Sequence, residues 1–341
     1  MLTSTQIESN LRNQDLESLY LFYGEEIYLL ENCVKKIKVK FGDLVKGINY
    51  IEIDETSLNT LISEMETPPF GYEKKLIIVK NASVFGKDTK KKSAKDTGFA
   101  NKINDYILAN VEYIKTSIIL VFVEQEAEKS DLFKTIDSNG VVCNFELLKP
   151  LDLEKRIKSI CKAYGTNIES DTIRYFIECV GTNMQDIINE LRKLIEFAGK
   201  GGTIKKGDIE LLTIKQIDSV IFDLTDSLGK KDTAEALCVL KNLIYMKEPV
   251  QKILITLYNH FKKLYIVTLA NRLGKDASSS LNLKPNQTFL ISKYKAQAKY
   301  FSENELRLLL QKLIDLDYNY KIGNIDLDVG MESIMCAYCS R

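Results

Sequence analysis

The amino-acid sequence predicts an α/β domain with a parallel sheet, followed by two domains built only from helices. In residues 1–147, short apolar runs typical of buried strands alternate with segments whose apolar residues recur at helical spacing. After Lys149-Pro150 the strand-like runs cease and only helical periodicity remains. A chain of 341 residues, 45% hydrophobic and 28% charged, is long enough for several domains with cores of their own.

Five strands are predicted in the first domain, and helices connect them. The strands cover residues 19–23, 50–53, 76–79, 117–123 and 141–145. The helix after the first strand is predicted to bury a face made of Ile27, Leu30, Val34, Ile37 and Phe41. Strands that alternate with helices in this way indicate parallel pairing, with the helices on the faces of the sheet.

A second helix of this domain, which begins near Ser57, is predicted to end at two prolines. Its apolar face consists of Leu58, Leu61, Ile62 and Met65. Pro68 and Pro69 end it, because neither can donate a backbone hydrogen bond. Phe70 follows directly, and Gly71 gives the backbone the freedom to turn. A large aromatic residue on such a restricted turn is either a plug for the domain's own core or an anchor for another protein.

Helical patterns with clear start and stop signals fill the rest of the chain. Residues 149–212 are predicted to form three helices, which end at Gly165, Gly181 and Gly199. Beyond residue 213, amphipathic helices are predicted to pack as a bundle and to cover residues 216–228, 232–246, 248–273, 284–299, 302–320 and 325–339. The helix over 302–320 carries an apolar stripe of Leu306, Leu309, Leu310, Leu313 and Leu316.

Three segments, in this order and spacing, resemble the delta subunits of the bacterial DNA polymerase III clamp loader. They are LESLYLFYGEEIYLLENCVKKI, NYIEIDETSLNTLISEMETPPFGYEKKLIIVKN and GTNMQDIINELRKLIEF. The resemblance extends over essentially the whole chain. It implies an AAA+-like domain over residues 1–148, a small helical lid over 149–212, and a helical collar over 213–341 through which clamp-loader subunits join.

The expected AAA+-like fold lacks the residues that nucleotide chemistry requires. A phosphate-binding turn should end in Gly-Lys-Ser/Thr, but the turn after the first strand reads Gly24-Glu25-Glu26, and its carboxylates repel a triphosphate. The third strand should end in acidic residues that hold magnesium, yet it ends in Lys80-Asn81. No Ser-Arg-Cys motif occurs. We therefore expect no ATP hydrolysis and no cofactor.

The resemblance also implies a site and a set of partners. In that family the turn corresponding to Pro69-Phe70 enters a hydrophobic pocket on the sliding clamp (the beta subunit). Family members often have leucine before the phenylalanine, whereas this chain has Pro69. The expected clamp-binding residues are Phe70, Pro69, Met65 and Gly71. The implied role is to bind and open the clamp for loading onto primed DNA during replication, together with delta-prime and gamma/tau subunits, as a non-catalytic part of a DNA-directed DNA polymerase holoenzyme.

The charge balance and the absence of targeting signals limit which functions and cellular locations we expect. Lysine plus arginine equals aspartate plus glutamate at 47 each, so bulk charge does not indicate autonomous DNA binding. The lysine-rich stretch from Lys87 to Lys102 is interpreted as a solvated flexible loop, with a phosphate-binding patch as the alternative. The N-terminus lacks the apolar run of a signal peptide, the longest apolar run is far too short for a membrane span, and the cysteines suit reduced thiols, so we expect a cytoplasmic protein.

Two further residue patterns are interpreted as structural. The single histidine, His260, cannot form a metal cluster or a triad, and Cys336 and Cys339 lack the second pair of ligands that a zinc site needs. Two functions other than the clamp-loader role stay open. The first is a divergent NTP-dependent DNA-processing ATPase, which nucleotide binding by the isolated chain would favour. The second is a plain scaffold, which burial of Phe70 would favour.

Overall fold

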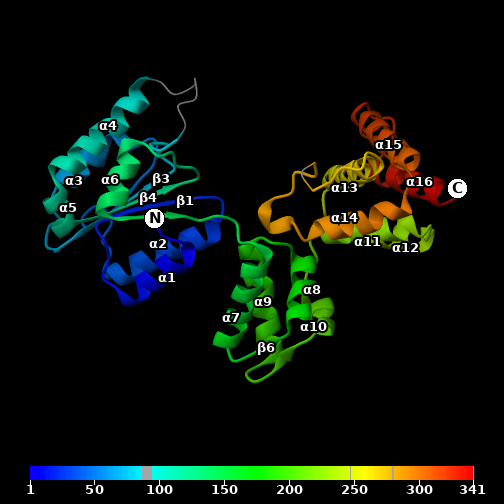
Figure 1. Ribbon diagram of the computed structural model, residues 1–341, viewed down its shortest axis with the longest axis horizontal. Coiled ribbons are helices and arrows are strands. Elements are labelled where there is room, and N and C mark those ends of the chain that lie inside the picture. Colours follow the sequence, from blue (N-terminus) through cyan, green and yellow to red (C-terminus); the bar gives the residue numbers. More distant parts are fainter. Residues whose placement is uncertain (87–93, 246, 279, 341) are drawn as a thin grey trace. The chain divides into compact units, whose positions relative to one another are not determined.

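In the computed structural model, which describes residues 1–86, 94–245, 247–278 and 280–340, the chain divides into two units, Met1–Leu147 and Leu148–Arg341 (Figure 1). The first unit contains a sheet of five parallel strands in the order β2-β3-β4-β1-β5. They are β1 (Leu19–Tyr23), β2 (Tyr50–Ile53), β3 (Lys75–Lys80), β4 (Ile118–Glu124) and β5 (Val141–Asn144). All five lie where the sequence predicts strands, which confirms the parallel α/β fold. None of the described helices is long and apolar enough to cross a membrane.

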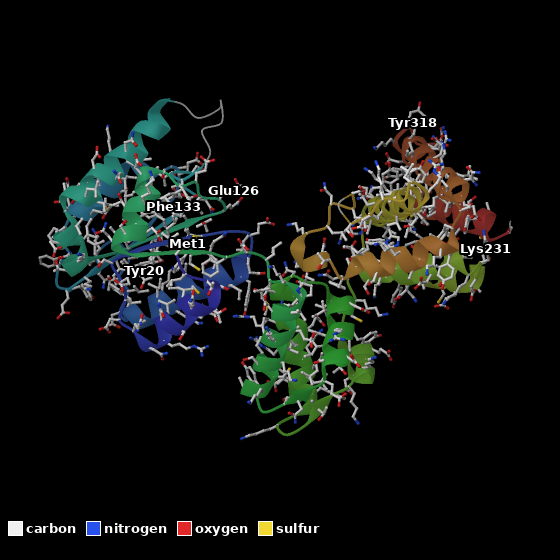
Figure 2. All side chains as sticks on the ribbon, viewed as in Figure 1. Met1, Tyr20, Glu126, Phe133, Lys231 and Tyr318 are labelled. Atoms are coloured by element: carbon white, nitrogen blue, oxygen red, sulfur yellow. The ribbon has the colours of Figure 1, made fainter. Side chains whose placement is uncertain are left out.

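Helices cover both faces of this sheet (Figure 1). On one face lie α1 (Ser4–Asn13) and α2 (Ile27–Phe41). On the other lie α3 (Leu61–Glu66), α4 (Ala94–Ala109), α5 (Val111–Ser117) and α6 (Asp131–Asn139). Successive residues of a strand point to opposite faces, so Leu19 and Leu21 of β1 join Phe133 of α6 in one core, while Tyr20 points away from it (Figure 2).

Two expectations for the first unit need correction, and one helix was not expected. Ile27 is 59% exposed, because it is the first residue of α2 and the buried face is formed instead by Leu29, Leu30, Cys33, Val34 and Ile37. The helix α1, which the sequence analysis does not predict, begins with a capping box between Thr3 and Gln6. Residues 87–93 of the lysine-rich stretch lie outside the described residues, but the part from residue 94 onward belongs to α4, so it is not a loop.

The second unit begins with four helices rather than the expected three. They are α7 (Pro150–Ala163), α8 (Ser170–Val180), α9 (Met184–Ala198) and α10 (Lys206–Leu212). Asn183 caps α9, as predicted, by accepting the N–H groups of Gln185 and Asp186. The region is also not purely helical, since β6 (Asn167–Ile168) pairs in parallel with β7 (Thr203–Ile204). Strands of two residues are too short to leave an alternating pattern in the sequence.

The remaining helices share one hydrophobic core, which extends from Ile217 to Tyr338. They are α11 (Ile217–Gly229), α12 (Thr233–Tyr245), α13 (Val250–Arg272), α14 (Leu290–Gln297), α15 (Glu303–Lys321) and α16 (Leu327–Cys339). The predicted helix over 284–299 is shorter than expected, because 3-10 turns at Pro285–Gln287 and Ala298–Tyr300 flank α14. Leu306, Leu309, Leu313 and Leu316 of α15 are buried, and Leu310 is partly buried. The separation of lid from collar at residue 212 stays a prediction.

His260 lies in the core of the C-terminal helices and is held by Gln297. The Gln297 amide donates hydrogen bonds to the Phe222 carbonyl at 2.9 Å and to the Asp226 carboxylate at 2.7 Å. Its oxygen, 2.8 Å from His260 Nε2, therefore accepts, and the neutral histidine carries its proton on Nε2. Burial lowers the pKa of His260 to about 4, with the nearby Lys263 charge acting in the same direction and the bond to Gln297 opposing it. The structural interpretation of this residue agrees with the geometry.

Acidification is expected to destabilise the C-terminal helices through His260. The folded pKa of about 4 lies below the ordinary 6.5, so the unfolded chain takes up the proton first. The contribution of His260 to the free energy of unfolding is then constant above pH 6.5. It falls by about 3 kcal/mol as the pH drops from 6.5 to 4, at about 1.4 kcal/mol per pKa unit. Urea unfolding at both pH values, compared with His260→Gln, isolates this contribution from that of the carboxylates. An equal acid dependence in the variant would contradict the assignment.

Candidate functional site

The connection between α3 and β3 presents one aromatic side chain to solvent. A 3-10 turn, Leu58–Thr60, leads into α3, which ends at Glu66, and Thr67 then adopts an extended conformation. The Tyr72 N–H donates to the Pro69 carbonyl at 3.3 Å, and Gly71 has φ +79°. A left-handed residue at the third position is the mark of a type II turn, for which glycine is suited. The turn therefore holds Phe70 at its second position.

Phe70 is 88% exposed, so it is not part of the core of its own unit. This exposure contradicts the scaffold interpretation in which Phe70 is a plug. Pro69 is half-buried and Gly71 is exposed, and both belong to the same turn as Phe70. Three of the four residues expected to bind a partner are thus brought together at one place on the surface.

Met65 is the exception among those four residues, because its side chain is wholly buried. It packs in the core of the first unit with Leu61 of the same helix and Ile77 and Val79 of β3. The spacing that put Met65 on the apolar face of the helix was therefore informative, but that face points into the protein. Met65 is therefore not available to a partner in this conformation.

Lys75 is a residue of the site that sequence reasoning missed. It is the first residue of β3, it is 2% exposed, and its ammonium lies 2.8 Å from a carboxylate oxygen of Glu64. A lysine among apolar strand residues is normally assigned to the solvated end of the strand. The double proline was the signal that could have pointed to it, because prolines leave helix carbonyls without donors.

The turn after β1 occupies the position of a phosphate-binding loop but is closed by the sheet itself. Only Gly24, Glu25 and Glu26 separate β1 from α2. The Gly24 N–H donates to the Glu124 carbonyl at 3.3 Å, and the Glu26 N–H donates to the Phe145 carbonyl at 2.9 Å. These amides are therefore not directed at a phosphate. A Cβ on Gly24, which has φ +131°, would lie 2.4 Å from the Phe145 oxygen, so the chain passes too close for any other residue.

The carboxyl end of β3 is equally altered. Lys80 stands at this strand end and forms an ion pair with Glu31 of α2 at 2.9 Å. A lysine already paired with a protein carboxylate replaces the acidic group that would hold magnesium. Among the described residues, no group of three or more histidine, cysteine, aspartate or glutamate side chains is placed to hold a metal, and Cys336 and Cys339 are free thiols in α16.

Comparison with known proteins places these features in a family. A family model described as "DNA polymerase III, delta subunit" matches residues 20–146, and one described as "DNA polymerase III delta subunit, C-terminal domain" matches residues 218–338. Together the two models match well over half of the chain.

Individual relatives agree with these models. The chain is 24% identical over 338 residues to DNA polymerase III subunit delta of Bacillus subtilis (strain 168), covering 97% of this chain and 96% of the relative. It is 26% identical over 310 residues to the probable DNA polymerase III subunit delta of Aquifex aeolicus (strain VF5), covering 88% and 85%. The solved structure of the Bacillus subtilis DNA clamp loader delta protein superposes with a TM-score of 0.73 at 22% identity, covering 99% of this chain and 100% of that one. The chain belongs to the DNA polymerase III delta subunit family.

Proposed function

We propose that this chain is the clamp-loader subunit that binds the sliding clamp through the turn at Phe70 and favours the clamp's open form, without hydrolysing ATP. The observation that carries the proposal is an aromatic side chain that is 88% exposed on a turn restricted by two prolines. Burying a phenylalanine is worth roughly 1.5–3 kcal/mol by area alone. In the free chain this free energy is not gained, so it is available to a partner that covers the side chain. Pro69 and Gly71 supply the stiffness and the bend that present it.

Direct binding to the cognate sliding clamp tests the proposal. The purified full-length chain, immobilised, is exposed to increasing concentrations of clamp, and binding is followed by biolayer interferometry. Saturable binding that free peptide 64–75 of this chain competes away is the expected result, since the peptide contains the whole turn. Failure of the clamp to bind at tens of micromolar, where specific protein partners bind readily, would refute the proposal.

The proposed partners on the collar side are the delta-prime and gamma/tau subunits. Helix α15 exposes Ile314 (48%) and Tyr318 (64%), and Ile322 (52%) follows at its C-cap; Tyr318 is seen in Figure 2. These residues recur at i, i+4 and i+8, so they form one apolar stripe along the helix. A stripe of this kind suits packing against a helix of a neighbouring subunit. Primed DNA would be met within the assembled cytoplasmic complex, since the chain has no net charge of its own.

The isolated chain is expected to bind no ATP. The amides of Gly24 and Glu26 already donate to backbone carbonyls, so they are not available to bind phosphate groups. Lys80, which is paired with Glu31, stands where an acidic residue would bind magnesium. Equilibrium titration with a fluorescent ATP analogue and magnesium measures this. Saturable binding that micromolar ATP reverses would favour the divergent ATPase over the present proposal.

A further inference from the structure

The double proline that restricts the Phe70 turn also leaves helix α3 without two hydrogen bonds. In an α-helix the carbonyl of residue i accepts from the N–H of residue i+4. The Glu64 and Met65 carbonyls would therefore accept from residues 68 and 69, but Pro68 and Pro69 carry no N–H. These carbonyls can be satisfied by water or by a side-chain donor from elsewhere in the chain.

Lys75 provides that donor from the start of β3. Its Nζ donates to the Glu64 carbonyl at 2.9 Å and to the Glu64 carboxylate at 2.8 Å, with a longer contact of 3.4 Å to the Thr67 carbonyl. An ammonium has three donors, so these acceptors satisfy the buried charge completely. A cation is also favoured at the C-terminal end of a helix, where the carbonyls carry partial negative charge.

The contacts of Lys75 close the base of the turn. Residues 67–74 connect α3 to β3, and the ammonium joins the residues at the two ends of this connection. Leu61 and Met65 fix α3 in the core, and the backbone of β3 pairs with β2 and β4. Both ends of the connection are thus immobilised, and the remaining freedom lies in a few residues around Phe70. A side chain presented in this way loses little entropy when it docks.

We infer that Lys75 is the positioning residue of the partner-binding turn: its buried ammonium donates to the Glu64 carbonyl, which Pro68 leaves without a backbone donor, and to the Thr67 carbonyl, and so holds Phe70 ready to dock. The inference rests on the proposed function for its purpose, but the order of the turn can be measured without any partner. Lys75 itself does not contact the partner, because it is buried beneath the turn.

The sequence contains no tryptophan, so a tryptophan introduced in the turn can report on its mobility. Phe70→Trp introduces a single tryptophan at the tip of the turn, which can be excited selectively in the presence of the 17 tyrosines. Its time-resolved anisotropy reports how freely that side chain and its backbone move. The test variant is Lys75→Met, which keeps the length of the side chain and removes the ammonium. Lys80→Met is the matched control, because Lys80 ends the same strand and also forms an ion pair with a glutamate, at 2.9 Å from Glu31.

In the Phe70→Trp background, Lys75→Met is expected to increase the fast component of the tryptophan anisotropy decay, whereas Lys80→Met leaves it unchanged. In chains that retain Phe70, Lys75→Met is expected to weaken clamp binding about 3- to 10-fold, the cost of ordering one additional side chain on association. Lys80→Met should bind as the unmodified chain does. Lys75→Leu, which also removes the ammonium, gives a second variant should Lys75→Met fail to fold, and it too should mobilise the introduced tryptophan.

The outcomes separate this inference from the proposed function. Unchanged anisotropy in folded Lys75→Met, or in Lys75→Leu where only that variant folds, would overturn the positioning role, even if the clamp binds normally. Equal mobilisation by Lys80→Met would overturn it as well, since the effect would then be a general loosening of β3. Conversely, failure of the clamp to bind the unmodified chain would refute the proposed function. The anisotropy measurement would still decide whether Lys75 orders the turn.

Discussion

Replacing Phe70 by alanine is expected to weaken clamp binding by about 30- to 1000-fold, since truncating a hot-spot aromatic costs about 2–4 kcal/mol and each decade of affinity corresponds to about 1.4 kcal/mol. The physical reason is that Phe70 is 88% exposed in the free chain and would be desolvated only in the complex. Its removal therefore costs the complex much and the fold little. Clamp affinity and the melting temperature are measured on the same variant.

Two further variants sharpen this experiment. Pro69→Ala should weaken binding less, because it removes stiffness and a small contact while the aromatic anchor remains. Tyr245→Ala removes an aromatic side chain that is 87% exposed at the end of α12, so it controls for the general effect of deleting exposed aromatic surface. It is expected to leave clamp affinity unchanged. A Phe70→Ala variant that melts normally and binds the clamp normally would show that the anchor lies elsewhere.

The sequence was sufficient for features that depend on local patterns. All five strands of the sheet follow from apolar runs, and the turn at Phe70 follows from two prolines and a glycine, whose backbone restrictions act regardless of tertiary context. The exposure of Phe70 itself did not follow from the pattern, which left core and partner open. Only the packing of the surrounding helices decides whether an aromatic residue on a turn is covered.

The features that sequence reasoning missed depend on contacts between distant segments or on very short elements. The paired strands β6 and β7 have two residues each, and α1 is stabilised by a capping box at the chain start. Lys75 acquires its role from Glu64 and Thr67, through an arrangement of chain ends that no periodicity reveals. Helical spacing placed Met65 on the correct face of α3 but could not say whether that face meets solvent or the core.

Met65→Ala is expected to give the opposite result to Phe70→Ala, although the two residues lie close together in the chain. Met65 is wholly buried against Leu61, Ile77 and Val79, so its truncation leaves a cavity in the first unit. Loss of a buried methionine costs about 2–5 kcal/mol of unfolding free energy. Urea unfolding should detect this loss, while the folded variant, assayed in the cold, should bind the clamp as the unmodified chain does.

The comparison of these two variants decides which of the residues first assigned to the docking surface belong to it. Met65→Ala with unaltered stability would show that the side chain does not fill the core. Met65→Ala that is fully folded yet binds as weakly as Phe70→Ala would return Met65 to the interface, because α3 would then have to open on docking. In the double variant the two effects should remain separate, the stability loss being that of Met65→Ala alone and the affinity loss that of Phe70→Ala alone. Such a result would mean that packing against the core keeps the turn rigid, and that no core side chain becomes exposed when the turn docks.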